Sequence, residues 1–314
     1  NGVVHIIDKV LVPPSIAKFV NTVVEPAYFN KNFTTLIAAV TAASPSILET
    51  LLNSSKKTLF APTNAAFTAA GITALPARPT LDAVLAYHVI GSEVKASQLP
   101  TNAAPSNSAI TTLGGVFYLS NRGSNGVFIN GRTKVTATDI MADNGVVHVI
   151  DRTLMPPSQT IAEIATALST ASTGAEFTQL VAALGRVPDL LGAAAAAGSN
   201  LTVFAPTDAA FSALYTALGV SGINDIGLSL LTAVLQHHII SSPTTVTGRV
   251  FSSDLITGSV PTLNGNISIS ATAATVTSGN GTVANISSNA ALVNVLGTNG
   301  VIHTIDKVLV PSGK

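Results

Sequence analysis

The chain has 314 residues but no cysteine and no tryptophan, and only 10% of its residues are charged. Without cysteine it cannot form disulfides, use a thiol nucleophile or build a zinc site on thiolates. Fifteen basic residues balance fifteen acidic residues and form no basic run, which argues against nucleic acid or an anionic membrane surface as a partner. No apolar run reaches the roughly 18 residues of a membrane-spanning helix, so no such span is predicted.

Apolar residues, in contrast, make up 47% of the chain, and its polar fraction is mostly Ser, Thr and Asn. This composition is far from that of a disordered chain and predicts a packed core. We take the abundance of small polar residues as an indication of an extracellular surface.

Internal repeats organise the sequence. One motif, Asn-Gly-Val-Val/Ile-His, opens three similar segments, at residues 1–14, 144–157 and 299–311. Two further motifs occur twice in the same order, at residues 58–67 and 202–211 and at residues 85–90 and 235–240. Ordered motifs at this long period indicate duplication of a whole domain, not a solenoid of short repeats.

The motifs also set the predicted domain boundaries. The first domain is predicted at residues 15–157 and the second at residues 158–314, while residues 1–14 are predicted to be the C-terminal strand motif of a preceding copy. Each copy ends in proline, which cannot continue a strand and should form a short, stiff joint.

Within each copy, helical patterns precede strand patterns. Apolar residues recur at helical spacing over residues 33–40 and again over residues 177–184. Short strand-like runs separated by Gly and Asn follow, over residues 116–137 and residues 267–286. The last strand is predicted in the Asn-Gly-Val-Val-His segment, with Asn-Gly supplying the turn before it. Helices followed by antiparallel strands predict an α+β fold in two tandem copies.

Together, the Thr-Leu-Phe-Ala-Pro-Thr-Asn motif, the Tyr87-His88 pair and the Asn-Gly-Val-Val-His motif resemble the conserved blocks of the fasciclin (FAS1) domain. The resemblance covers both copies. It implies an antiparallel β-sandwich with a wedge of N-terminal helices, an extracellular or cell-surface location, and a role in adhesion or matrix assembly.

A narrower resemblance concerns Asp139 and Ile140, which are similar to an Asp-Ile element linked in this family to receptor binding. The second copy has Asn294 and Val295 at the corresponding place, and His237 where the first copy has Tyr87. A receptor role for this element is therefore expected of the first copy alone.

His88 and His238 lie on the apolar face of a predicted helix, with Leu or Val residues three, four and seven positions earlier in both copies. We predict buried, hydrogen-bonded histidines that fix the packing of helix on sheet. Their partners are expected in the turn that contains Asn64 in the first copy and Asp208 in the second.

His148 and His303 each precede an aspartate by three positions, at Asp151 and Asp306, which suggests part of a catalytic triad. Side chains three apart on a strand point to opposite faces, so neither pair can converge on one substrate. No Gly-x-Ser-x-Gly elbow, metal-ligand pattern or nucleotide-binding loop accompanies them. We therefore predict no enzyme activity, no cofactor and no metal, and assign His148 and His303 to the structural motif.

The sequence thus predicts a secreted or cell-surface tandem adhesion or extracellular-matrix protein. It would act through multivalent contacts with its own copies, matrix proteins or cell-surface receptors. The alternative is a protomer of an extracellular filament, assembled by strand exchange of residues 1–14. A small-ligand carrier with an apolar cleft is the third class. If the chain is secreted from a eukaryotic cell, its sequons are candidate glycan sites, at Asn32, Asn53, Asn200, Asn266, Asn280 and Asn285.

Overall fold

The computed structural model describes residues 2–8, 12–241, 249–289 and 291–313. Contacts divide the chain into two units. The first unit comprises Asn1–Leu99, Ile110–Phe117 and Thr133–Pro156, and the second comprises Pro100–Ala109, Tyr118–Arg132 and Pro157–Lys314. Two segments of the first sequence repeat therefore make most of their contacts within the second unit.

The helices of the first unit lie between Pro14 and Gln98. They are α1 (Pro14–Ala17), α2 (Glu25–Tyr28), the 3-10 turn η1 (Lys31–Phe33), α3 (Thr34–Ala42), α4 (Pro45–Leu52), α5 (Asn64–Ala69), α6 (Arg78–Tyr87) and the 3-10 turn η2 (Ala96–Gln98). Proline opens α4, where its missing N–H costs no helical hydrogen bond. The Thr63 hydroxyl caps α5 by accepting from the Ala66 N–H at 3.2 Å.

One sheet has the strand order β2-β1-β7-β6-β5-β4-β3. Its strands are β1 (Lys57–Pro62), β2 (Val89–Ile90), β3 (Ser108–Thr112), β4 (Gly115–Asn121), β5 (Val127–Ile129), β6 (Thr133–Ala142) and β7 (Gly145–Ile150), with the turn η3 (Gly123–Asn125) between β4 and β5. β1 and β7 run parallel and are buried along their whole length, which explains why their sequences are mainly apolar and do not alternate. β6 pairs antiparallel with β7, but its register shifts on either side of Ala137.

The two faces of β1 contact different layers. Leu59 packs with helical residues such as Leu36 and Leu85 in one apolar cluster. Phe60, the next residue, makes edge contact with the Phe117 ring at 5.3 Å between centroids. Alternation along the strand therefore places helices on one face and further strands on the other, confirming the predicted α+β sandwich with a helical wedge.

The second unit repeats this arrangement. Its helices are α7 (Ile161–Ser169), α8 (Thr178–Gly185), α9 (Pro188–Ala195), α10 (Asp208–Leu218) and α11 (Leu228–His237), with the 3-10 turns η4 (Ile223–Asp225) and η5 (Ser252–Asp254). Its strands are β8 (Leu201–Pro206), β9 (Ile239–Ser241), β10 (Gly258–Pro261), β11 (Asn266–Ser270), β12 (Thr275–Thr277), β13 (Val283–Asn285), β14 (Val295–Gly297) and β15 (Gly300–Ile305).

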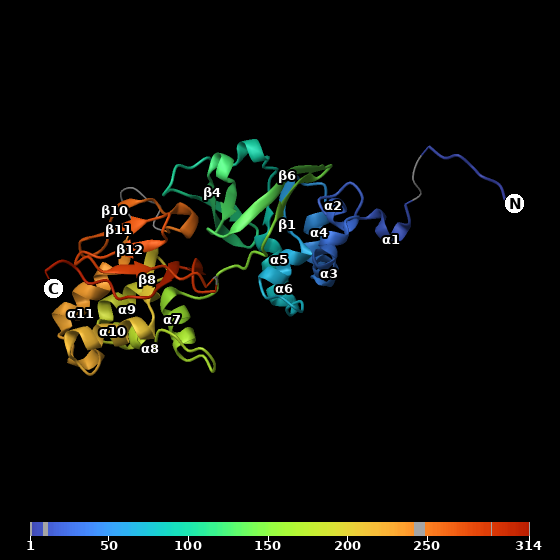
Figure 1. Ribbon diagram of the computed structural model, residues 1–314. Helices are drawn as coiled ribbons and strands as arrows, with labels where there is room; N and C mark the ends of the chain where they lie inside the picture. The colour runs from blue at the N-terminus through green and yellow to red at the C-terminus, as the bar shows by residue number, and fades with distance from the viewer. Residues whose placement is uncertain (1, 9–11, 242–248, 290, 314) are drawn as a thin grey trace. The chain divides into compact units, whose positions relative to one another are not determined.

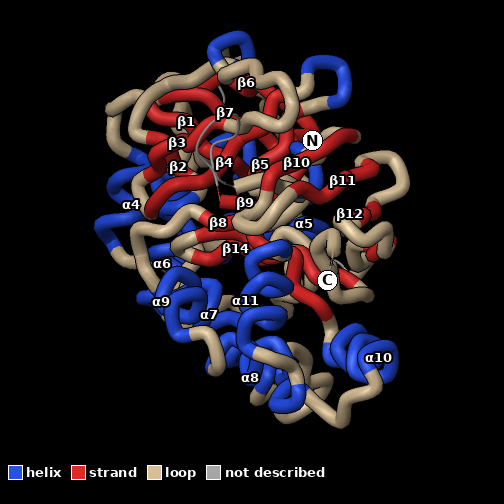
Figure 2. Tube along the Cα trace, turned by 90° about the vertical axis from the view of Figure 1, so that its left-hand side faces the viewer, coloured by secondary structure: helices blue, strands red, loops and turns tan. Residues whose placement is uncertain are grey.

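The second sequence repeat contributes two four-stranded sheets, with the orders β14-β15-β8-β9 and β10-β11-β12-β13. In Figure 1 the helices α7–α11 lie on one side of β8 and the strands β10–β12 on the other, and Figure 2 shows the same separation for α8, α9 and α11. Val203 accordingly belongs to the cluster under the helices, whereas Phe204 belongs to the cluster between the sheets. The unit is thus a three-layer structure whose central sheet is buried on both faces.

The segment before α1 differs from the expectation. Residues 2–8 and 12–13 form no strand, and Val3, Val4 and Ile6 are 82%, 89% and 99% exposed. These residues are therefore not paired as a strand in this chain, while residues 1 and 9–11 lie outside the described part. That residues 1–14 are the C-terminal strand motif of a preceding copy stays a prediction. The same motif forms a strand in β7 and β15 because two neighbouring strands pair with it there, and the structure gives residues 2–8 no such neighbour.

Candidate functional site

His88 and His238 are buried at equivalent places, each directly after a helix, α6 or α11. The Nδ1–H of His88 donates to the Val84 carbonyl oxygen at 2.7 Å, and its Nε2 accepts from the Leu154 N–H at 3.0 Å. His238 makes the same two contacts with the equivalent backbone groups, at 2.7 and 2.8 Å. Each imidazole therefore ties the end of a helix to the segment after the last strand, and only the neutral Nδ1–H tautomer can make both bonds.

These contacts confirm the predicted burial but show that the predicted partners were wrong. Each ring lies at the C-terminal end of α6 or α11 and bonds to that helix and to the chain leaving the sheet, whereas Asn64 and Asp208 begin other helices, α5 and α10. Burial lowers the pKa of His88 and of His238 from 6.5 to about 4, since the charged form would lose its hydration. The carbonyl that accepts from Nδ1 opposes this pKa shift only in part.

His148 and His303 lie on the face of β7 and β15 that points away from the helices, and they contact phenylalanine rings there. His148 Nε2–H donates to the Val94 carbonyl at 2.9 Å, and His303 Nε2–H donates to the Val250 carbonyl at 2.8 Å. The neighbouring Asp151 instead accepts from the Lys134 N–H at 2.7 Å. His148 and Asp151, which were expected to point to opposite faces, therefore have different partners.

Asn144 and Asn299 are buried residues whose role the sequence reading missed, because it assigned Asn-Gly only to a turn. The Asn144 Oδ1 accepts from the Val23 N–H at 2.7 Å, and its Nδ2 donates to the carbonyls of Leu51 and Asn53 at 2.9 and 2.8 Å. Asn299 repeats all three contacts, at 2.8, 2.8 and 3.0 Å. One amide in each repeat thus joins the N-terminal segment, the C-terminal end of α4 or α9 and the start of the last strand.

The glycine after each of these asparagines is required by close backbone contact. A Cβ on Gly145, whose φ is +151°, would lie 1.9 Å from the Lys57 carbonyl oxygen of the paired strand. A Cβ on Gly300 would lie 2.4 Å from the equivalent Leu201 oxygen. The Asn-Gly pair therefore reflects both a buried amide and strands that approach too closely for any side chain.

Asn64 and Asp208, at the start of α5 and α10, join helices to each other. The Asn64 Oδ1 accepts from the Thr35 N–H at 2.9 Å, while its Nδ2 donates to the Lys31 carbonyl. The Asp208 carboxylate accepts from the Gln179 N–H at 2.8 Å and from the Thr178 hydroxyl at 2.7 Å. Both side chains satisfy N–H groups that the first turn of α3 or α8 leaves free.

Asp139, the residue expected to bind a receptor, lies where the register of β6 shifts and has φ +59°. Its Oδ1 accepts from the Ala96 N–H at 2.8 Å, so it caps η2. Asn294 has φ +55°, and its Oδ1 accepts from the Ser252 N–H at 2.8 Å, so it caps η5 in the same way. Ile140 is half-buried against the core of the first unit. The receptor contact at Asp139 and Ile140 stays a prediction.

Replacing Asp139 tests this structural role. Asp139→Ala removes the cap and places an unfavourable residue at positive φ, so we expect a loss of about 1–2 kcal/mol in the free energy of unfolding. Asp139→Asn reproduces the second repeat and should change it by less than about 0.5 kcal/mol. Urea unfolding of the full chain measures both, and equal destabilisation by the two substitutions would contradict the capping role.

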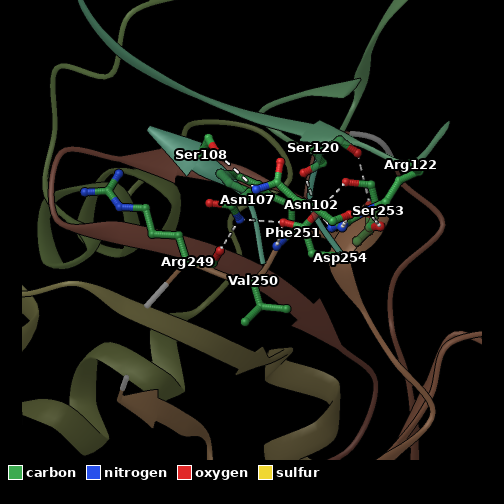
Figure 3. A network of polar contacts seen from close by, with 12 residues as sticks. Asn102, Asn107, Ser108, Ser120, Arg122, Arg249, Val250, Phe251, Ser253 and Asp254 are labelled. Carbon is green, nitrogen blue, oxygen red and sulfur yellow. Dashed lines mark hydrogen bonds and ion pairs between the residues drawn. The ribbon is translucent and has the colours of Figure 1, made fainter. Parts of the chain in front are cut away.

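Figure 3 shows a network around Asp254, a fully buried carboxylate in η5. Arg122 Nη2 donates to its Oδ1 at 2.6 Å, the Asn107 amide donates to its Oδ2 at 2.7 Å, and the Ser120 hydroxyl donates to Oδ1. The Ser253 hydroxyl and the Phe251 N–H donate as well, at 3.0 and 3.1 Å. Every oxygen of this buried charge is therefore satisfied, as its burial requires.

The three more distant donors, Asn107, Ser120 and Arg122, come from the first sequence repeat but belong to the second unit by their contacts. Arg249, also buried, lies in the same region with its guanidinium 4.7 Å from the centre of the Tyr118 ring. It donates to the Gly297 carbonyl at 2.9 Å. Polar contacts thus hold two segments of the first repeat within the second unit.

Comparison with known proteins identifies the class. The fasciclin domain model matches residues 31–156 and again residues 175–311, and the chain therefore belongs to the fasciclin family. Protein sll1483 of Synechocystis sp. is 37% identical over 147 residues, which are 43% of this chain and 74% of that protein. Human periostin is 30% identical over 247 residues, which are 76% of this chain and 26% of periostin.

Among solved structures, a FAS1 domain pair from the insect cell adhesion molecule fasciclin I is similar, with a TM-score of 0.40 and 18% identity. The match covers 89% of this chain and 97% of the fasciclin I chain. Within the described residues, no helix is both long and apolar enough to cross a membrane.

Proposed function

We propose that this chain is a secreted or cell-surface adhesion or matrix protein that acts through multivalent protein contacts and not as an enzyme. Membership of the fasciclin family, with two domains in one chain, supports an adhesion-type role. Its partners would be further copies of itself, matrix proteins or cell-surface receptors. The observation that carries the proposal is that the side chains repeated in both domains serve internal contacts, so the repeated motifs maintain a scaffold.

The nearly neutral surface chemistry of such a protein favours weak contacts that gain strength by repetition. Beads coated with the full chain should therefore aggregate, or bind matrix-coated surfaces, only above a threshold coating density. Soluble chain should inhibit poorly because it engages one contact at a time. If beads at the highest density neither aggregate nor bind cells or matrix, the adhesive function is excluded; if soluble chain inhibits fully at equal concentration, multivalency is excluded.

A filament protomer is the second candidate, favoured by the exposure of Val3, Val4 and Ile6. These residues repeat the sequence that forms the buried strand β7, so they could add to the sheet of a neighbouring copy. Electron microscopy of the intact chain and of a variant lacking residues 1–13 separates the two functions. Filaments that disappear on deletion support the protomer, whereas bead aggregation that survives deletion supports the adhesive monomer.

A further inference from the structure

The second unit contains a cavity of about 290 Å³ between α10, α11 and the end of the chain. Its floor is apolar and buried, and includes Phe211, Leu231 and Val234 at 0%, 1% and 3% exposure. Leu218, which also lines it, is 45% exposed, so the cavity opens to solvent at the end of α10. Cavities that bind small molecules combine such apolar walls with a few polar groups.

Lys307 is the single charged residue among those that line this cavity. It is exposed, and the described part of the chain offers it no hydrogen bond or ion pair. Asn280 and Thr282 supply the remaining polar lining. The Asn280 Oδ1 already accepts from the Thr282 N–H at 3.0 Å, which leaves the amide NH₂ as a donor for a ligand. The polar lining therefore has one positive charge and neutral donors, a combination that suits one carboxylate.

The first repeat provides an internal comparison. Arg152 occupies the position equivalent to Lys307, directly after the motif aspartate, and donates to the Ala69 carbonyl at 3.1 Å, at the end of α5. There the chain turns at Gly71, and Ile72 packs against the core. In the second repeat α10 continues to Leu218 and Lys307 has no such acceptor. The repeats have the same fold, but the second has a cation beside an open apolar cavity.

We propose that this cavity binds a medium-chain monocarboxylate, with the alkyl tail against Phe211 and Val234 and the carboxylate on Lys307. The volume lies at the lower end of the range for ligand pockets, roughly 300 Å³, which favours a single short tail over a large polycyclic ligand. The proposal concerns the second repeat alone and does not depend on adhesion.

Isothermal titration of the full chain with sodium hexanoate, octanoate and decanoate tests the proposal. Affinity should rise about fourfold for each added methylene until the cavity is full. Decanol has the tail without the charge and should bind about fivefold more weakly than decanoate. Absence of saturable decanoate binding, or affinity that does not depend on tail length, would overturn the site.

Three variants locate the ligand. Lys307→Met should weaken decanoate about fivefold and leave decanol unchanged, because it removes the charge and keeps the apolar stem. Ala217→Phe should fill the cavity from the exposed face of α10 and abolish binding of both ligands. Arg152→Met, the matched change in the first repeat, should alter neither. Circular dichroism establishes that each variant is folded, and unchanged decanoate binding in Lys307→Met or Ala217→Phe would place the ligand elsewhere and refute the assignment.

Discussion

Lowering the pH from about 7 to about 5 should destabilise the second unit by about 4 kcal/mol and the first by about 2 kcal/mol. Burial lowers the pKa of His88 in the first unit, and of His238 and His303 in the second, from 6.5 to about 4. Below about pH 6.5 these histidines therefore bind protons in the unfolded chain but stay neutral in the folded chain. Stability is complete above the unfolded pKa and falls as the pH decreases towards the folded pKa.

The main physical cause is burial, because a charged imidazolium in the core would lose its hydration. A protonated imidazole also cannot accept a hydrogen bond. Protonation of His238 would break its bond from the Leu309 N–H and leave a buried charge. The His303 imidazole is wholly buried, although the Val250 carbonyl and the Asp254 charge partly oppose its lowered pKa. Most carboxylates stay ionised above about pH 5, so the range from pH 6.5 to 5 reports mainly on histidine.

Urea unfolding monitored by hydrogen exchange at each pH measures this loss of stability for each unit separately. Exchange in β8 and β15 should accelerate more steeply with acid than exchange in β1 and β7. His5→Gln, at an exposed histidine outside both cores, is the control and should leave the profile unchanged. NMR signals of His88, His238 or His303 that titrate near pH 6.5 in the folded chain, or equal losses in both units, would contradict the prediction.

The fold was accessible from the sequence because its signals are local and occur twice. Helical spacing, glycine turns and the motif order each indicated the same layout, and the apolar face around His88 predicted its burial. These features depend on residues a few positions apart, so a single sequence contains them. The duplicated pattern also acted as an internal check, because His238 has the same neighbours.

The hydrogen-bond partners that lie far along the chain could not be predicted from the sequence. The Leu154 N–H that binds His88 is far along the chain, and nothing beside the histidine specifies it. Asn144 was read as a turn residue because Asn-Gly has that local meaning, whereas its amide satisfies backbone groups on two distant segments. Residues 2–8 show a related limit, since a strand pattern becomes a strand only beside a partner.

Asp254 was missed altogether, and its equivalent in the first repeat explains why. Gln98 occupies that position and accepts from the Lys95 N–H at 2.8 Å, which is a local cap. Asp254 makes the same type of local bond to the Phe251 N–H, and the local sequence indicates no more than this. The partners that bury its charge, Arg122 and Asn107, are over one hundred residues away.

Replacing Asp254 by Asn should lower the free energy of unfolding of the second unit by about 3–5 kcal/mol. The substitution keeps the shape of the side chain but leaves the Arg122 guanidinium, whose side chain is 9% exposed, without a counter-charge. It also places an NH₂ group where one oxygen now accepts hydrogen bonds, so at least one buried donor loses its acceptor. Asp143→Asn, at an exposed aspartate, should have almost no effect.

The double variant distinguishes the ion pair from general disruption. Arg122→Met removes the buried charge, so Asp254→Asn should cost at least about 1 kcal/mol less in that background than in the native chain. Hydrogen exchange should accelerate in residues 100–109 and 118–132 of the Asp254→Asn chain, because Asn107, Ser120 and Arg122 hold these segments to the carboxylate. Additive costs, or unchanged exchange in the two segments, would show that Asp254 caps η5 and does not retain the first repeat's segments in the second unit.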